Sequence, residues 1–215
     1  MSKLEQVQKT FVGSLSSRAF YGYEKDKEVF AKLQELQKQT NFFGKPLGQH
    51  KFSQAKERTD ILDGFVQRWI DANPDGRILS VGCGFCTRRW RLDIKDTHWT
   101  ELDFPEMIDL RHKVLPIEDP EKHVYIGHDL KDPHNIPYDL LIGEGVFMHM
   151  PESWARLHIK GEVIFDVQGL GRKTGLGQTM RWRWDPEQWN FKIIDKQRFD
   201  VKIDAREAWA LWVIA

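Results

Sequence analysis

Residues 77–104 read RILSVGCGFCTRRWRLDIKDTHWTELDF, and this stretch decides the fold class. It contains two strand-like runs, 78–81 and 98–104, and the first leads directly into Gly82-Cys83-Gly84. Residues with β-branched and aromatic side chains favour strands, and paired glycines let a backbone approach a ligand closely. The pattern is typical of a strand and turn in an open α/β sheet, where ligands bind outside the carboxyl ends of the strands.

Similar apolar runs recur at 123–130, 138–146 and 162–169, with helix-like connections such as PEMIDLRHKVL between them. Such spacing predicts parallel βαβ units, and runs without alternation predict strands that are buried on both faces. The last two runs, 191–203 and 208–215, lie too close together for a helix and predict an antiparallel pair. The sequence therefore predicts an α/β, Rossmann-like fold, whose seven-stranded sheet is mostly parallel with an antiparallel C-terminal edge.

The N-terminal part predicts helices that cover this core. Leu4, Val7, Phe11 and Leu15 recur at steps of three and four residues, which places them on one helix face. A second apolar stripe, within 61–70, stops at the turn signal Asn73-Pro74-Asp75-Gly76. We expect one domain over 1–215, with a helical N-terminal cap at 1–55 and a Rossmann-like core at 56–215.

The composition limits the kinds of partner that we expect the protein to bind. Lys plus Arg and Asp plus Glu both number 32, so the formal charge is zero and provides no bulk field that would attract nucleic acid. No stretch approaches the 18 apolar residues of a membrane span, and the first residues lack the apolar run of a signal peptide. With only two cysteines, the chain suits a reducing compartment. We therefore expect a cytoplasmic protein that acts on a small molecule, without a nucleic-acid or membrane partner.

Three acids follow the glycines at the ends of successive predicted strands. Asp103 lies 19 residues beyond Gly84 and suits the hydroxyls of a ribose. Asp129 ends the next strand, where it and the adjacent backbone suit an adenine edge, and Glu144 ends the strand after that, where it suits an ammonium group. Single carboxylates at such places are commonly caps or solvated loop residues. Taken together, however, they fit a ligand with an amine, a ribose and an adenine, and S-adenosylmethionine is such a ligand.

Several segments, in this order, resemble the leucine carboxyl methyltransferase family, which includes polyketide O-methyltransferases. They are Arg58-Thr59-Asp60, VGCGFCTRRWRL, THWTELDFPEMIDLRHKVL, HDL and LLIGEGVFMHM. The resemblance covers about 55–150. It implies a class I fold that binds S-adenosylmethionine and releases S-adenosylhomocysteine.

The resemblance also implies roles for individual residues. Arg58 would hold the methionine carboxylate, and the backbone of Gly82, Cys83 and Gly84 would lie against the cofactor. Asp103 would take the ribose, Asp129 and Leu130 the adenine, and Glu144 the methionine amine. The chain departs from the family at Cys83 (usually Ala), at Cys86 (where the family favours Asp) and at His149 (where an aromatic residue is common).

The remaining candidates concern the methyl acceptor. His149 follows the fourth predicted strand and is a candidate base or hydrogen-bond donor, or else a helix-start residue that packs locally. In GRKTGLGQTMRWRW, Arg172 and Arg181 are candidates to clamp an anionic substrate, with Trp182 as an apolar wall. The alternative is that the tryptophans enter the core and the arginines are solvated. The resemblance implies that Arg88 is structural or near the site, and we expect Arg89 and Arg91 at the surface of the helix that follows the glycines.

These observations predict an S-adenosylmethionine-dependent O-methyltransferase that acts on a carboxylate of a small-molecule metabolite. A hydroxyl acceptor in natural-product biosynthesis is the alternative within that class. Cys83 and Cys86 form a C-x-x-C after a strand, so a thioredoxin-like thiol oxidoreductase is an alternative of another class. A cofactor-binding protein without catalysis is a third alternative. Two cysteines alone do not complete the four ligands of a zinc site, so we expect no metal.

Overall fold

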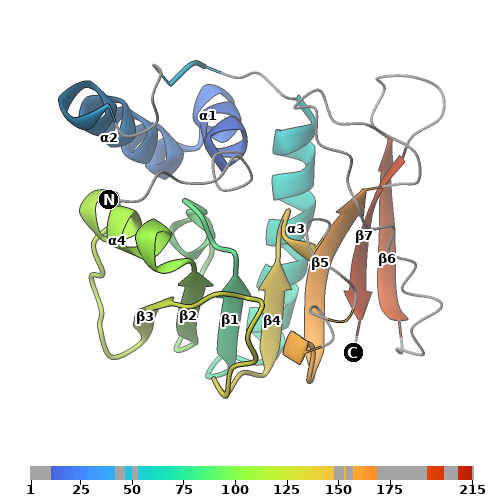
Figure 1. Ribbon diagram of the computed structural model, residues 1–215. Coiled ribbons are helices and arrows are strands. Elements are labelled where there is room, and N and C mark those ends of the chain that lie inside the picture. Colours follow the sequence, from blue (N-terminus) through green and yellow to red (C-terminus); the bar gives the residue numbers. More distant parts are fainter. Residues whose placement is uncertain are drawn as a thin grey trace.

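A seven-stranded sheet organises the protein (Figure 1). The computed structural model describes residues 11–41, 47–49, 53–147, 153, 157–168, 193–200 and 208–214. Within them the strand order is β3-β2-β1-β4-β5-β7-β6. The strands are β1 (Arg77–Val81), β2 (His98–Asp103), β3 (His123–Gly127), β4 (Leu140–Gly143), β5 (Glu162–Gln168), β6 (Ile193–Asp200) and β7 (Ala208–Ile214).

Strand direction places the candidate site. β1 pairs in parallel with β2 and β4, and β2–β3 and β4–β5 are also parallel. β7 pairs antiparallel with both β5 and β6. The order along the sheet reverses between β1 and β4, so their carboxyl ends border a topological switch point, where open α/β sheets bind ligands.

Among the described residues, the α-helices are α1 (Phe11–Phe20), α2 (Glu24–Thr40), α3 (Ser53–Ala72) and α4 (Pro105–Val114). Helix α3 ends where the sequence predicts, and the Gly76 amide donates to the Asn73 carbonyl oxygen at 3.0 Å in the following turn. Pro105 opens α4, where its missing N–H has no intrahelical partner to lose. None of these described helices combines the length and apolarity that a membrane crossing requires.

The helix expected after the glycines is absent from the described residues, and this prediction is wrong. Only the short 3₁₀ turn η2 (Arg88–Trp90) forms there. The Thr87 hydroxyl donates to Asp26 at 2.5 Å, and Arg88 donates to Asp63 at 2.7 Å. Side chains of this segment therefore bond to residues that are distant in sequence. These contacts fix a conformation that local helix propensity does not determine.

Apolar side chains cover both faces of the parallel strands, as their continuous apolar runs predict. Leu62, Val66 and Ile70 of α3 pack in a cluster with Ile78 and Leu140 on one face. The opposite face carries a second cluster, which includes Leu79, Val81, Leu141, Val163 and Phe165.

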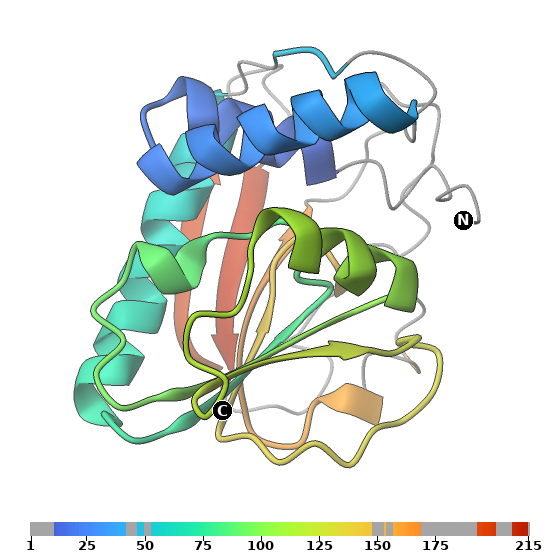
Figure 2. The same ribbon diagram turned by 90° about the vertical axis from the view of Figure 1, so that its left-hand side faces the viewer.

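The two N-terminal helices form a cap. Figures 1 and 2 show α1 and α2 beyond the carboxyl ends of β1 and β2. Leu15 and Leu33 of the cap belong to one buried cluster with Phe85 of the glycine turn and Leu110 of α4. The cap therefore packs against the segment that carries the candidate site.

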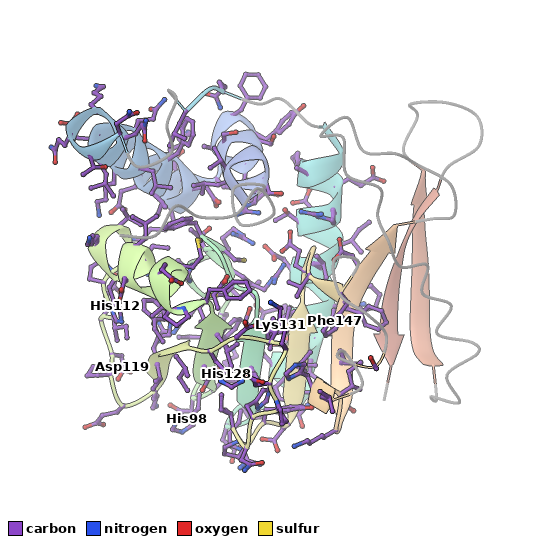
Figure 3. The ribbon with its side chains drawn as sticks, viewed as in Figure 1. His98, His112, Asp119, His128, Lys131 and Phe147 are labelled. Carbon is purple, nitrogen blue, oxygen red and sulfur yellow. The ribbon has the colours of Figure 1, made fainter. Side chains whose placement is uncertain are left out.

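Three histidines gather beside the segment that links β3 to β4. The rings of His134 and His158 stack with centroids 5.0 Å apart, and the His128 ring lies 6.1 Å from that of His134. Figure 3 labels His128 next to this segment. Burial, together with His158, His128 and Lys160, lowers the pKa of His134 to about 4. His134 is therefore neutral at pH 7.

Replacing Gly82 by Ala is expected to destabilise the protein by about 1–3 kcal/mol, because Gly82 has φ 58° and an added Cβ would lie 2.4 Å from Val146 Cγ2. Urea unfolding measures the change. Gly48→Ala is the control, since a Cβ there meets nothing within 4 Å, and it should stay within about 0.5 kcal/mol. Adding Val146→Ala to Gly82→Ala should recover part of the loss. Unchanged stability of Gly82→Ala would contradict the strain.

The low pKa of His134 predicts acid sensitivity. Below its ordinary pKa of 6.5, the unfolded chain binds a proton at His134 that the folded chain takes up only near pH 4. Stability is therefore insensitive to this group above pH 6.5 and falls between pH 6.5 and 4. Unfolding free energies at pH 7.5 and 5.0 should differ less in His134→Asn than in the wild type. A pH dependence in His134→Asn as large as that of the wild type would refute this assignment.

Candidate functional site

The turn after β1 adopts a backbone conformation that favours glycine at two positions. Gly82 and Gly84 have φ values of 58° and 47°, in the left-handed region that side chains disfavour. The Cys83 amide donates to the Leu102 carbonyl at 3.2 Å, and the Cys86 amide donates to the Cys83 carbonyl at 2.9 Å. We call residues 82–86 the glycine turn. It lies at the carboxyl end of β1, as the sequence predicts.

Asp103 holds the glycine turn from the end of β2. Its Oδ2 accepts the Gly84 amide at 2.7 Å, and its Oδ1 accepts the amide of Phe104 at 2.8 Å. Burial raises the pKa of Asp103, although the two amides oppose this. A carboxylate has about four lone-pair sites, so each oxygen can still accept a ligand hydroxyl. The structure thus brings Asp103 and Gly84 together, while ribose binding by Asp103 stays a prediction.

Glu144 follows β4 and is surrounded by arginines. Its carboxylate lies 2.9 Å from Arg58, 2.7 Å from Arg88 and 3.8 Å from Arg18. Burial favours the neutral acid, but Arg58, Arg88 and Arg18 lower the pKa of Glu144 well below its usual range. Glu144 is therefore a buried carboxylate anion.

Arg58 extends from α3 toward this carboxylate. It donates to Asp166 at 3.2 Å and to the Ser14 hydroxyl at 3.2 Å. The contact of Arg58 with Glu144 lacks hydrogen-bond alignment, and within the described residues both Arg58 Nε and Glu144 Oε1 are buried without a hydrogen-bond partner. The two residues that sequence reasoning assigned to the methionine end therefore lie together, each with hydrogen-bonding capacity unused.

Asp129 lies apart from these groups. Its Oδ1 accepts the Lys131 amide at 3.0 Å in its own turn, and its side chain is 37% exposed. The neighbouring Leu130 is buried, and its carbonyl accepts a hydrogen bond from His158 Nε2 at 2.7 Å. Figure 3 labels His128 and Lys131, which flank this pair, and Phe147, which follows Glu144. Adenine binding by Asp129 and Leu130 stays a prediction.

Four buried acids and four arginines form what we call the charge network, and sequence reasoning missed half of it. Asp166 carried a signal, since it interrupts the apolar run of β5, where acids are rarely buried without a partner. Asp26 and Asp63 lie in charged helical segments that gave no such signal, and Arg18 is the one charged residue of α1, where it stood out by no motif. The network consists of Arg18, Asp26, Arg58, Asp63, Arg88, Arg91, Glu144 and Asp166.

The expectation that Arg89 and Arg91 lie at the surface is wrong. Arg89 is buried, and Arg91 contacts Asp63 at 2.6 Å and Asp26 at 3.4 Å. Asp26 of α2 and Asp63 of α3 both face Arg91, so these two helices enclose it. Arg88, expected near the site, contacts Glu144.

The thiols do not form the reactive pair that a redox role requires. Cys83 is buried, and burial raises its pKa well above the ordinary value, so it remains a neutral thiol. A redox C-x-x-C motif depends on a thiolate in a polar, accessible place. This geometry disfavours the thioredoxin-like alternative.

Four residues that we expect to contact the methyl acceptor lie outside the described residues: His149, Arg172, Arg181 and Trp182. In the part of the chain that the structure does describe, no group of three or more His, Cys, Asp or Glu side chains is arranged to hold a metal ion.

Comparisons with known proteins agree with this architecture. No family model matches the chain. The chain is 30% identical over 102 residues to the tetracenomycin polyketide synthesis O-methyltransferase TcmP of Streptomyces glaucescens. The match covers 45% of this chain and 37% of TcmP, so the chain spans little more than a third of that relative.

Solved structures share the fold at low sequence identity. Magnesium protoporphyrin IX methyltransferase (ChlM) from Synechocystis PCC 6803 with bound SAM matches with a TM-score of 0.53 and 14% identity, over 100% of this chain and 99% of that one. The methyltransferase domain of bacterial CtHen1-C matches with a TM-score of 0.52 and 12% identity, over 72% of this chain and 97% of that one. The chain therefore has the Rossmann-like fold of class I S-adenosylmethionine-dependent methyltransferases.

Proposed function

We propose that the protein is an S-adenosylmethionine-dependent O-methyltransferase, with the cofactor bound against the glycine turn. The hydrogen bond from the Gly84 amide to Asp103 carries this proposal. It joins a carboxylate to a turn with two left-handed glycines, at the switch point between β1 and β4. The similarity to TcmP and the shared fold support the same cofactor.

The unused groups of Arg58 and Glu144 fit the methionine end of that cofactor. A ligand carboxylate would accept from Arg58 Nε, and a ligand ammonium would donate to Glu144 Oε1. Because the charge network contains four cations and four anions, the zwitterionic amino-acid end of the cofactor would add no net charge to it; the sulfonium carries a separate positive charge. Asp103 would take the ribose hydroxyls, and Leu130 and Asp129 would border the adenine.

The cofactor supplies a methyl group on a sulfonium, which is its own leaving group. An acceptor oxygen bonds to the methyl carbon as the carbon–sulfur bond breaks, and the sulfur keeps the electron pair, which yields S-adenosylhomocysteine. The protein must therefore position the acceptor and exclude water. A carboxylate acceptor is already ionised at neutral pH and has no proton to lose, whereas a hydroxyl acceptor needs a base.

We propose a carboxylate of an anionic small molecule as the acceptor, held by Arg172 and Arg181 beside Trp182. His149 would orient that carboxylate, or would act as base if the acceptor is a hydroxyl. The name of TcmP, a polyketide synthesis O-methyltransferase, supports oxygen as the acceptor atom and makes a natural-product hydroxyl the second candidate. The cytoplasmic location stays a prediction.

Asp103→Asn is expected to weaken S-adenosylhomocysteine binding by about tenfold or more, because it removes the charge that strengthens hydrogen bonds from a ribose. Isothermal titration calorimetry measures the affinity. Asp109→Asn, an exposed acid on α4, is the matched control and should bind like the wild type. A folded Asp103→Asn variant with wild-type affinity would remove Asp103 from the site, and a wild type that binds no S-adenosylhomocysteine would refute the proposed function.

The acceptor class can be tested with cofactor that carries a radiolabelled methyl group. After incubation with metabolite extracts, mild alkali should release the label as volatile methanol, because esters hydrolyse under conditions that leave ethers intact. Alkali-stable label would instead indicate a hydroxyl acceptor. In that case His149→Ala should lower turnover by about 10²–10⁴-fold, the usual contribution of a general base. Binding of S-adenosylhomocysteine without any labelled product would favour the non-catalytic alternative.

A further inference from the structure

Arg111 of α4 is fully buried and bonds to the glycine turn. Its Nη1 donates to the Gly84 carbonyl oxygen at 2.8 Å, and its Nη2 donates to the Cys86 carbonyl oxygen at 2.8 Å. The side chain has no exposed surface. A buried arginine that bonds to two carbonyls of one turn fixes the orientation of both peptide groups.

A second set of contacts fixes Arg111 itself. Its Nη2 lies 2.6 Å from both carboxylate oxygens of Glu101, and His123 Nε2 donates to Glu101 Oε2 at 2.7 Å. The guanidinium also lies over the Tyr125 ring, 4.9 Å from its centroid. Glu101 on β2 and His123 on β3 are themselves buried, so the rigid sheet sets the position of this arginine.

Several backbone amides and carbonyls of the glycine turn thus have hydrogen-bond partners within the protein. The Gly84 amide donates to Asp103, and the Cys86 amide donates to the Cys83 carbonyl. The Gly84 and Cys86 carbonyls are both held by Arg111. Loss of the guanidinium would leave these two carbonyls without that donor, and buried polar groups avoid such a state by reorienting.

Arg111 and Asp103 belong to one structural unit. Helix α4 begins at Pro105, two residues after Asp103 ends β2. The β2–α4 unit therefore contacts the glycine turn through two side chains. Asp103 accepts a hydrogen bond from an amide of the turn, and Arg111 donates to two of its carbonyls. The turn and the acid beside it are held in one geometry.

From this arrangement we propose that Arg111 is a positioning residue for the cofactor: it holds the glycine turn in its binding shape before the cofactor arrives. This rests on the proposed function, since the cofactor is expected to lie against that turn. A preformed turn lowers the ordering cost of binding, so Arg111 acts on affinity without touching the ligand.

Three variants separate this role from simple stability. Arg111→Met/Glu101→Gln removes the guanidinium and its counter-charge together, so no unpaired charge is left buried. Glu101→Gln alone keeps Arg111 on both carbonyls. Lys113→Met, an exposed change on the same helix, is the matched control. Thermal unfolding verifies folding, and titration calorimetry measures S-adenosylhomocysteine affinity.

We expect Lys113→Met to bind within about threefold of the wild type, and the double variant to bind at least about tenfold more weakly than Glu101→Gln. A purely structural role would lower the melting temperature of both Glu101 variants without separating their affinities. A folded double variant that binds as tightly as Glu101→Gln overturns the proposal. Absence of binding by the wild type would instead count against the proposed function.

Hydrogen exchange of the ligand-free wild type is a second test. It uses neither a ligand nor a variant, so it does not depend on whether the double variant folds. The Gly84 and Cys86 amides should exchange as slowly as those of β1, because the turn is already formed. Exchange at the rate of the exposed Gly48 amide would show that the turn is not preformed and would overturn the proposal. This result decides the matter if the double variant does not fold.

Discussion

The charge network is the constraint on which the rest of the structure depends. Six of its members form a closed ring, in which each side chain contacts the next at 2.6–3.8 Å; Arg58 branches from Glu144, and Asp166 in turn contacts Arg58. Four arginines and four acids cancel in formal charge. Removing one partner from a buried pair costs about 3–5 kcal/mol, so no element can change its contribution alone. The ring comprises Arg18, Asp26, Arg91, Asp63, Arg88 and Glu144.

Two ionic clusters hold the glycine turn from different sides. The charge network reaches it through Thr87 and Arg88, directly after the turn, and joins it to the cap and to α3. Arg111, paired with Glu101, reaches it from α4. Between them the turn keeps two left-handed glycines against Asp103.

Sequence patterns predicted the parts of this site that depend on local order. A strand that runs into Gly82-Cys83-Gly84, and acids at the ends of later strands, follow from apolar periodicity and from the geometry of parallel sheets. Local patterns gave wrong predictions where contacts with residues distant in sequence determine the conformation. The expected helix at 88–91 is a 3₁₀ turn, because Asp26 and Asp63 bind its arginines.

The α/β class, the place of the glycine turn and the acid that ends β2 could all be predicted from the residue order, because each depends on one strand and the segment that follows it. The contacts between charged side chains became known from the folded chain alone. Arg58 and Glu144 lie far apart in sequence, and Arg58 and Asp166 lie farther apart still. Pairing of buried charges depends on distance and desolvation in the folded chain, and neither quantity is encoded in local spacing.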